Sequence, residues 1–126
     1  MGAAASSAVS EIEKAPWWVV CLCAGWCGVC REYRDGFEAL ARRRPEMRWH
    51  WLDVEEREDL VEDMDVETFP TLLIGRGSQA FFLGPLLPQH AVLERLLDSY
   101  VDGAPAAAQL PSEATPLFLR IAKALT

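Results

Sequence analysis

The most continuous hydrophobic pattern in the chain is the run Trp17–Cys23, which follows Pro16 without a polar interruption. Its residues favour strands, and a strand with one face in water would alternate with polar residues. The run is also far shorter than the roughly 20 residues that a membrane-spanning helix needs. The pattern therefore predicts a central buried strand, paired in parallel with a neighbour.

Helical periodicity begins directly after this strand. Across residues 27–44 apolar positions recur on one helical face, and Pro45 marks the end of the segment. A short helix is predicted over residues 58–64. A longer one is predicted over residues 88–101, which Gly103 terminates.

Three further strands are predicted between and beyond these helices. Residues 47–54 are β-like, and residues 71–74 and 79–83 are two strand-like runs separated by residues 75–78, a pattern typical of a hairpin. The order is then β, α, β, α, β, β, α. Right-handed crossovers place helices on both faces of the sheet. The fold class predicted is α/β, a three-layer α/β/α sandwich with a central mixed sheet of about four strands.

The rest of the chain divides into three segments. Residues 1–15 are expected to be a leader, partly disordered or a short helix, and residues 16–103 the main domain. Residues 104–126 are expected to be a Pro/Ala/Ser-rich linker followed by an appended C-terminal helix. Thr115 is the expected N-cap of that helix, and Pro116 its first residue.

Composition narrows the possible functions. The 12 basic and 19 acidic residues give a net charge of −7, which disfavours binding to nucleic acid or to an anionic membrane. The first residues lack the basic start and apolar core of a secretory signal, so a cytoplasmic protein is expected. A monomer is expected.

All four cysteines lie between positions 21 and 30, which indicates local chemistry rather than a disulfide framework. The spacing of Cys27 and Cys30 places the first sulfur at a helix N-terminus, which stabilises a thiolate, and the second one turn later. Cys27 is then the attacking sulfur and Cys30 the sulfur that resolves the mixed disulfide. A half zinc site is the alternative for such a pair, but strand geometry makes convergence of four sulfurs hard, so no metal is expected.

The residues around this pair resemble the thioredoxin family. The block Ala24–Arg31 is similar to its active-site loop after an apolar strand, and Phe69, Pro70 and Thr71 are similar to its cis-proline loop, some forty residues further on. Leu83 and Gly84 correspond to its glycine-containing loop. The resemblance runs from about Trp17 to Val101.

The resemblance implies a thioredoxin-like fold and a substrate-binding collar around Cys27, made of Trp26, Phe69, Pro70 and Gly84. It implies a cis Pro70 packed against the disulfide and a Phe69 backbone that pairs with an extended substrate segment. Without the resemblance, Pro70 would be a trans proline that opens an edge strand. Each aromatic residue alone would more often be core.

The chain also departs from the family pattern at positions expected to tune the redox site, namely Cys21, Cys23 and Val29, beside Gly28. Cys21 stands where thioredoxins carry a buried aspartate that moves protons to and from the second cysteine. Cys23 replaces an aromatic residue, and Val29 a proline. Only 16 residues precede Trp17, so a truncated N-terminal half is expected.

Two interpretations of Cys21 and Cys23 remain open. Both can be buried free thiols that behave as small hydrophobic side chains. Alternatively, Cys23 is a third redox-active thiol, because it lies only four positions before Cys27 in the sequence.

The function implied is that of a thioredoxin-type thiol:disulfide oxidoreductase. Its expected partners are protein disulfides and a reductant such as a thioredoxin reductase, and no cofactor is expected besides the Cys27–Cys30 disulfide. The alternative is a thioredoxin-like binding module with a vestigial or structural redox couple. A glutathione-dependent enzyme is less favoured, since only Arg31 and Arg34 lie near the pair in sequence.

Overall fold

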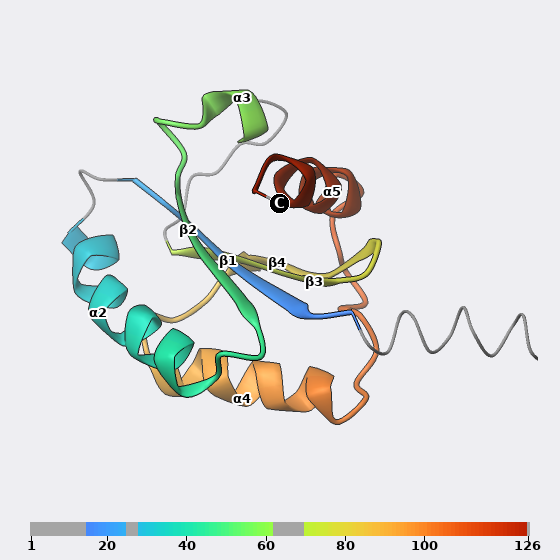
Figure 1. Ribbon diagram of the computed structural model, residues 1–126, viewed down its shortest axis with the longest axis horizontal. Coiled ribbons are helices and arrows are strands. Elements are labelled where there is room, and N and C mark those ends of the chain that lie inside the picture. Colours follow the sequence, from blue (N-terminus) through green and yellow to red (C-terminus); the bar gives the residue numbers. More distant parts are fainter. Residues whose placement is uncertain (1–14, 25–27, 62–69, 126) are drawn as a thin grey trace, which may run out of the picture.

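The computed structural model describes residues 15–24, 28–61 and 70–125, and it contains a four-stranded sheet with helices on both faces (Figure 1). The sheet has the order β2-β1-β3-β4. Its strands are β1 (Trp17–Cys23), β2 (Arg48–Asp53), β3 (Thr71–Arg76) and β4 (Gln79–Pro85).

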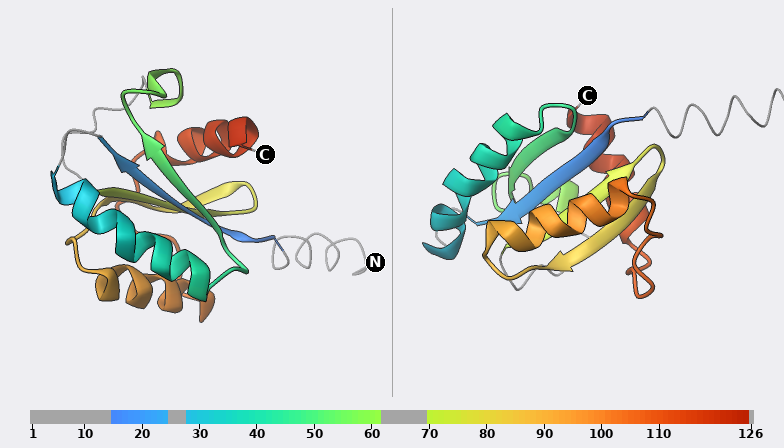
Figure 2. Two further views of the ribbon diagram at one scale, coloured as in Figure 1. Left: turned by 60° about the vertical axis from the view of Figure 1, so that its left-hand side comes forward. Right: turned by 90° about the horizontal axis from the view of Figure 1, so that it is seen from below.

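Within the described residues, two helices cover each face of the sheet. The face below the sheet in Figure 1 carries α2 (Gly28–Arg43) and α4 (His90–Val101). The opposite face carries α3 (Glu58–Val61) and α5 (Ala114–Leu125), and the two views of Figure 2 show the same layering. The predicted α/β/α sandwich, its mixed sheet and its appended C-terminal helix are confirmed.

The pairing of the strands follows the connections between them. β1 and β2 are parallel and joined through α2, as a βαβ unit requires, whereas β3 is antiparallel to both β1 and β4. The β3–β4 hairpin is tighter than predicted, because β3 continues through Gly75 and Arg76. Gly77 takes up the turn with φ of 63°, a conformation that glycine adopts without steric cost.

Strand β1 is buried on both faces and divides its side chains between two cores. Cys21 and Cys23 lie in the core that also contains residues of α2 and α4. Trp18, Val20 and Leu22 lie in the core with α3 and α5. Successive side chains of a strand point to opposite faces, so the alternation places both cysteines on the α2 side.

The C-terminal helix differs from the prediction at its first residues. It begins at Ala114, so Thr115 is not its N-cap. The Thr115 hydroxyl instead accepts a hydrogen bond of 3.2 Å from the Ala80 backbone N–H, which ties the start of α5 to β4. Among the described residues, no helix is both long enough and apolar enough to span a bilayer.

Candidate redox site

Cys30 is buried at the start of α2 and forms a disulfide with Cys23, the last residue of β1. Their Cα atoms are 5.9 Å apart, and both residues are 1% exposed. Cys23 points toward α2 because of the alternation along β1, and the first turn of α2 brings Cys30 onto the same face. Two elements that meet at the carboxyl end of β1 therefore build a buried sulfur pair.

This pairing corrects one expectation and complicates another. The interpretation of Cys23 as a free thiol is wrong, because its sulfur is bonded to Cys30. Cys27, the predicted partner of Cys30, lies outside the described residues. In the observed state the Cys30 sulfur is already bonded, so a Cys27–Cys30 disulfide would belong to a different state of the chain.

Cys21 is the free, fully buried thiol that the sequence predicted. Its sulfur lies 3.6 Å from that of Cys23. Since a disulfide sulfur carries no proton, the Cys21 S–H is the donor in this contact. Burial raises the pKa of the Cys21 thiol far above its usual range, so Cys21 stays protonated and cannot serve as a base.

Tyr33 is a second neutral group of the same core, one turn along α2 from Cys30. Burial raises its pKa, and the charge that Cys21 would carry raises it further. Its hydroxyl has no hydrogen-bond partner among the described residues, while its ring stacks on His90 at 4.8 Å. The His90 Nε2 lies 3.0 Å from the Tyr33 carbonyl oxygen, which fixes α4 against α2.

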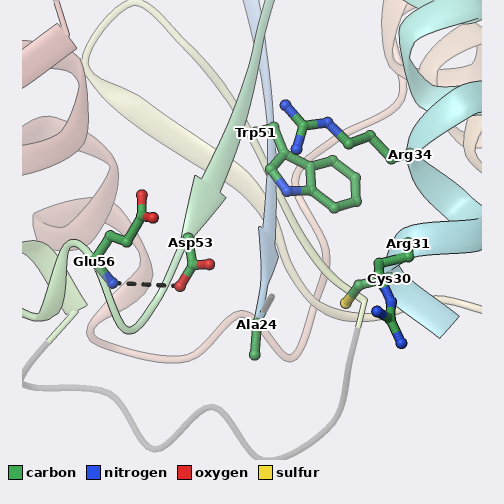
Figure 3. A pocket seen from close by; sticks show the side chains of 7 residues that line it. All are labelled: Ala24, Cys30, Arg31, Arg34, Trp51, Asp53 and Glu56. Carbon is green, nitrogen blue, oxygen red and sulfur yellow. Dashed lines mark hydrogen bonds between the residues drawn. The ribbon is translucent and has the colours of Figure 1, made fainter. Parts of the chain in front are cut away.

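A pocket of about 350 Å³ opens beside Cys30, between the start of α2 and the end of β2 (Figure 3). Cys30 faces it from α2, and Asp53 reaches it from β2. The Arg34 guanidinium lies 5.4 Å from the centre of the Trp51 ring, which anchors this basic side chain over the pocket wall. Its lining consists of Ala24, Cys30, Arg31, Arg34, Trp51, Asp53 and Glu56.

The Asp53 side chain is fixed at this pocket by hydrogen bonds from the backbone of the residues that follow it. Its Oδ1 accepts hydrogen bonds from the N–H groups of Glu55, at 2.8 Å, and Glu56, at 3.3 Å. Asp53 also pairs with Cys23 in the β1–β2 register. Strand pairing therefore brings a carboxylate to the pocket that Cys30 also lines, although neither the charge pattern nor the cysteine spacing predicted Trp51 or Asp53 as residues of this pocket.

The remaining predicted site residues are placed as follows. Trp26 and Phe69 lie outside the described residues. Gly28 and Val29 are exposed at the start of α2, Val29 to 42%. Pro70 is buried, and its carbonyl oxygen accepts the Leu86 N–H at 3.3 Å.

Register places the start of β3 beside the end of β1 that carries Cys23. Leu22, the neighbour of Cys23 in β1, pairs with Thr71, the residue that follows Pro70. Gly84 pairs with Leu72 at the same end of the sheet. The substrate-binding roles of Pro70 and Gly84, and the isomer of the Pro70 peptide bond, stay predictions.

A buried cysteine pair that joins a strand end to a helix start, on a mixed sheet covered by helices on both faces, defines the class of thiol–disulfide proteins with a thioredoxin-like fold. The family model described as Thioredoxin matches residues 4–84. The chain therefore belongs to the thioredoxin family.

Individual relatives agree with this assignment. Thioredoxin-1 of Saccharomyces cerevisiae is 33% identical over 75 residues, which are 60% of this chain and 73% of that protein. The H-type thioredoxin of Picea mariana is 35% identical over 57 residues, which are 45% of this chain and 46% of that protein. The chain spans about half the length of several curated relatives that it matches.

Solved structures show the same fold. The thioredoxin of Fasciola hepatica aligns with a TM-score of 0.62 and 25% identity, covering 76% of this chain and 91% of that one. The thioredoxin of Trypanosoma brucei brucei aligns with a TM-score of 0.63 and 18% identity, covering 77% and 85%.

Proposed function

We propose that the chain is a dithiol–disulfide oxidoreductase that reduces protein disulfides through Cys27 as nucleophile and Cys30 as resolving cysteine. The observation that carries this proposal is the position of Cys30. It lies within the block that resembles the family's active-site loop, is buried and sits in a disulfide, so its sulfur takes part in disulfide chemistry within this fold.

The reaction consists of two exchanges. The Cys27 thiolate attacks one sulfur of the substrate disulfide, forms a mixed disulfide and releases the other sulfur as a thiolate, which takes up a proton. The Cys30 thiolate then attacks the Cys27 sulfur and releases the substrate's second thiolate. The substrate gains two electrons and two protons, and the protein is left with a Cys27–Cys30 disulfide.

The start of α2 supports the first exchange. A helix carries a partial positive charge at its N-terminus, and α2 has 16 residues with no acidic side chain in its first turn. Cys27 immediately precedes this helix in the sequence. The uncompensated helix end therefore favours the thiolate of Cys27 over its thiol.

The second exchange requires that Cys30 lose its proton. Cys21 cannot accept that proton, because burial keeps its own thiol protonated. The route available runs into the pocket, where the side chains of Asp53 and Glu56 lie on the far side from Cys30. Proton transfer from Cys30 is therefore expected to be slower than with a carboxylate buried next to it.

The partners follow from the same chemistry. A protein disulfide presented in an extended segment is the substrate class, and a thioredoxin reductase is the proposed electron donor. One similar solved structure concerns thiol resolution in a yeast mitochondrial peroxiredoxin through glutathione and thioredoxin systems, which fits a protein disulfide as substrate. We infer a monomer in the cytoplasm, with no cofactor besides its own cysteines.

A second function is favoured by one specific observation. Because Cys30 is bonded to Cys23 inside the core, the disulfide can be a structural link, and the chain can then act as a binding module without turnover. Such a module would bind a partner in the same way before and after reduction. An activity measurement separates the two functions.

The test is reduction of insulin disulfides with dithiothreitol as electron donor, using the full chain. Wild-type protein should accelerate precipitation of the insulin B chain, and Cys27→Ser should abolish the acceleration. Glu32→Ala, an exposed change near the start of α2, is the matched control and should retain turnover. Absence of acceleration by the wild-type chain would favour the binding module.

A further inference from the structure

Cys30 has two candidate sulfur partners, one that the structure shows and one that the family resemblance implies. The structure shows it bonded to Cys23, seven residues earlier in the chain. The family resemblance pairs it instead with Cys27. A single cysteine cannot hold both bonds, so the two pairings are alternative states of one chain.

We propose that Cys30 alternates between Cys27 and Cys23 by internal thiol–disulfide exchange, which makes Cys23 a third redox cysteine of the site. The inference rests on the proposed function, because the exchange begins from the Cys27–Cys30 disulfide that substrate reduction leaves. It gives Cys23 a chemical role in addition to those of Cys27 and Cys30.

The exchange is balanced within the protein. The Cys23 thiol gives up its proton, and its thiolate attacks the Cys30 sulfur. The Cys23–Cys30 bond forms, the Cys27–Cys30 bond breaks, and Cys27 leaves as a thiolate, which takes up the proton that Cys23 released. One disulfide and one thiol are present before and after the step, so no external oxidant or reductant is needed.

Cys21 favours this chemistry through its contact with Cys23. Its S–H points to the Cys23 sulfur at 3.6 Å and can donate to the thiolate of Cys23 before attack and after its release in the reverse step. In place of the carboxylate that the family has at this position, the chain thus has a thiol that can donate a hydrogen bond to Cys23. The position holds a weak donor that contacts the third cysteine.

Burial gives the exchanged state a distinct reactivity. Cys23 and Cys30 are each 1% exposed, so an external thiol cannot approach their bond directly. The Cys23–Cys30 disulfide is converted back to the Cys27–Cys30 disulfide, which an external thiol can reduce, only when Cys27 attacks Cys30. Until then Cys27 is a thiol with no resolving partner, and a protein disulfide that it attacks stays attached as a mixed disulfide.

Peptide mapping distinguishes the two bonds. The full chain is oxidised with diamide, quenched in acid at successive times, blocked with N-ethylmaleimide and digested with chymotrypsin, which cleaves after Trp26. The Cys23–Cys30 bond joins two peptides, whereas the Cys27–Cys30 bond leaves a loop within one. We expect the loop first and the crosslink afterwards, as the main product at equilibrium.

Variants identify the sulfurs and the route. Cys23→Ala and Cys23→Ser should lose the crosslink completely and keep the loop, which also shows that they fold. Cys21→Ala, two positions earlier on the same strand face, should keep the crosslink at equilibrium, because the Cys21 sulfur contacts Cys23 without being bonded to it. Cys27→Ser should form the crosslink more slowly than the wild-type chain, because it lacks the exchange route.

Contrary results are equally defined. A wild-type chain that reduces insulin but shows only the loop at equilibrium would overturn the exchange and leave the proposed function intact. A Cys27→Ser chain that forms the crosslink at the wild-type rate would also overturn it, because the bond would then form without Cys27. A chain that forms the crosslink with no preceding loop and never reduces insulin would overturn the proposed function and the exchange together.

Discussion

At the residue scale, the site is notable for neutral groups packed around sulfur. Cys21 and Tyr33 both have raised pKa values because they are buried, so neither carries charge in the working pH range. The charged side chains that line the pocket with Cys30 belong to Arg31, Arg34, Asp53 and Glu56. Charge is therefore supplied from the pocket side of Cys30 rather than from the core.

The first prediction concerns the thiol that stands where the family has a carboxylate. Cys21→Asp should speed release of the mixed disulfide by about a hundredfold, the usual contribution of general-base help. It should also lower the free energy of unfolding, because a carboxylate at this fully buried position loses its hydration. Single-turnover reduction of a peptide disulfide, followed by mass spectrometry, measures the release.

Cys21→Asn is the matched control, since it has nearly the shape of aspartate but cannot accept the proton. It should lower stability without speeding release. If wild-type protein releases the mixed disulfide as fast as Cys21→Asp, the proton already leaves through the pocket. Asp53→Asn, which keeps the Oδ1 that accepts the Glu55 and Glu56 N–H groups, should then slow it.

At the element scale, the fit of α2 against α4 depends on the missing side chain of Gly36. A Cβ added there would overlap the His90 imidazole ring. That ring stacks on Tyr33 and approaches its carbonyl oxygen, so it occupies the space between the two helices. The glycine is a packing requirement inside a helix that would otherwise prefer alanine.

The second prediction is that Gly36→Ala destabilises the protein. The gain in helix propensity is about 1 kcal/mol, whereas overpacking typically costs about 1–3 kcal/mol, so the overlap should prevail. Urea unfolding followed by circular dichroism should give a lower midpoint. Gly28→Ala, where an added Cβ meets nothing within 4 Å, should change it little.

A double variant gives the converse test. Removing the ring with His90→Ala should make Gly36→Ala neutral or stabilising in that background. A penalty of equal size with and without the ring would show that His90 is not the cause.

The helices and strands were largely predictable because each has a strong local signal. The apolar run at residues 17–23 and the periodicity from residue 27 correspond to β1 and α2. The antiparallel pairing of β3 with β1 was not predicted, because strand order depends on contacts between distant segments. Likewise Thr115 matched an N-cap pattern, yet its hydroxyl bonds to Ala80 on a neighbouring strand.

The residues of the candidate site also differ in how far local sequence signals predicted them. Spacing predicted Cys30 as a redox cysteine, but it left Cys23 open between a buried free thiol and a third redox-active thiol. The alternation of β1 does place Cys23 on the α2 face, but a pattern does not give the distance to Cys30. Trp51 and Asp53 join the pocket through the β1–β2 register, which no local signal encodes.

At the scale of the whole molecule, stability should depend on pH through His50. Burial, and secondly the charge of Arg48, lower its pKa below the ordinary value of 6.5, and its ring stacks on Trp18 at 5.0 Å. A lowered pKa means that the unfolded chain binds the proton more readily than the folded one. Stability is then complete above the unfolded pKa and falls as pH drops through 6.5 toward the folded value.

The third prediction follows from this sign. As the pH is lowered from about 7.5 to 5.5, the thermal midpoint of the wild-type chain should decrease. The thermal midpoint of His50→Gln should decrease less. Differential scanning calorimetry at several pH values measures both slopes. Equal slopes in the two proteins would assign the pH dependence to other groups.

The sheet divides the molecule into a redox half and a half that only supports it. All three described cysteines lie in the core between the sheet and α2 with α4. The opposite core is closed by α5, whose Phe118 is fully buried. Its ring meets Trp18 edge-on at 6.1 Å, and it covers Gly75 so closely that a Cβ there would lie 2.5 Å from a ring carbon.

The last prediction tests this division. Phe118→Ala should lower the free energy of unfolding by about 3–5 kcal/mol, the usual cost of removing a fully buried phenylalanine, because the strands beneath α5 lose their cover. Leu119→Ala is the matched control on the same helix. Leu119 is 44% exposed, so its removal should cost no more than about 0.5 kcal/mol. Urea unfolding gives both values. Under native conditions the folded Phe118→Ala chain should still form the Cys23–Cys30 bond, because the sheet separates Phe118 from the cysteine core. A Phe118→Ala chain that stays folded but no longer forms that bond would show that the two halves of the molecule are coupled.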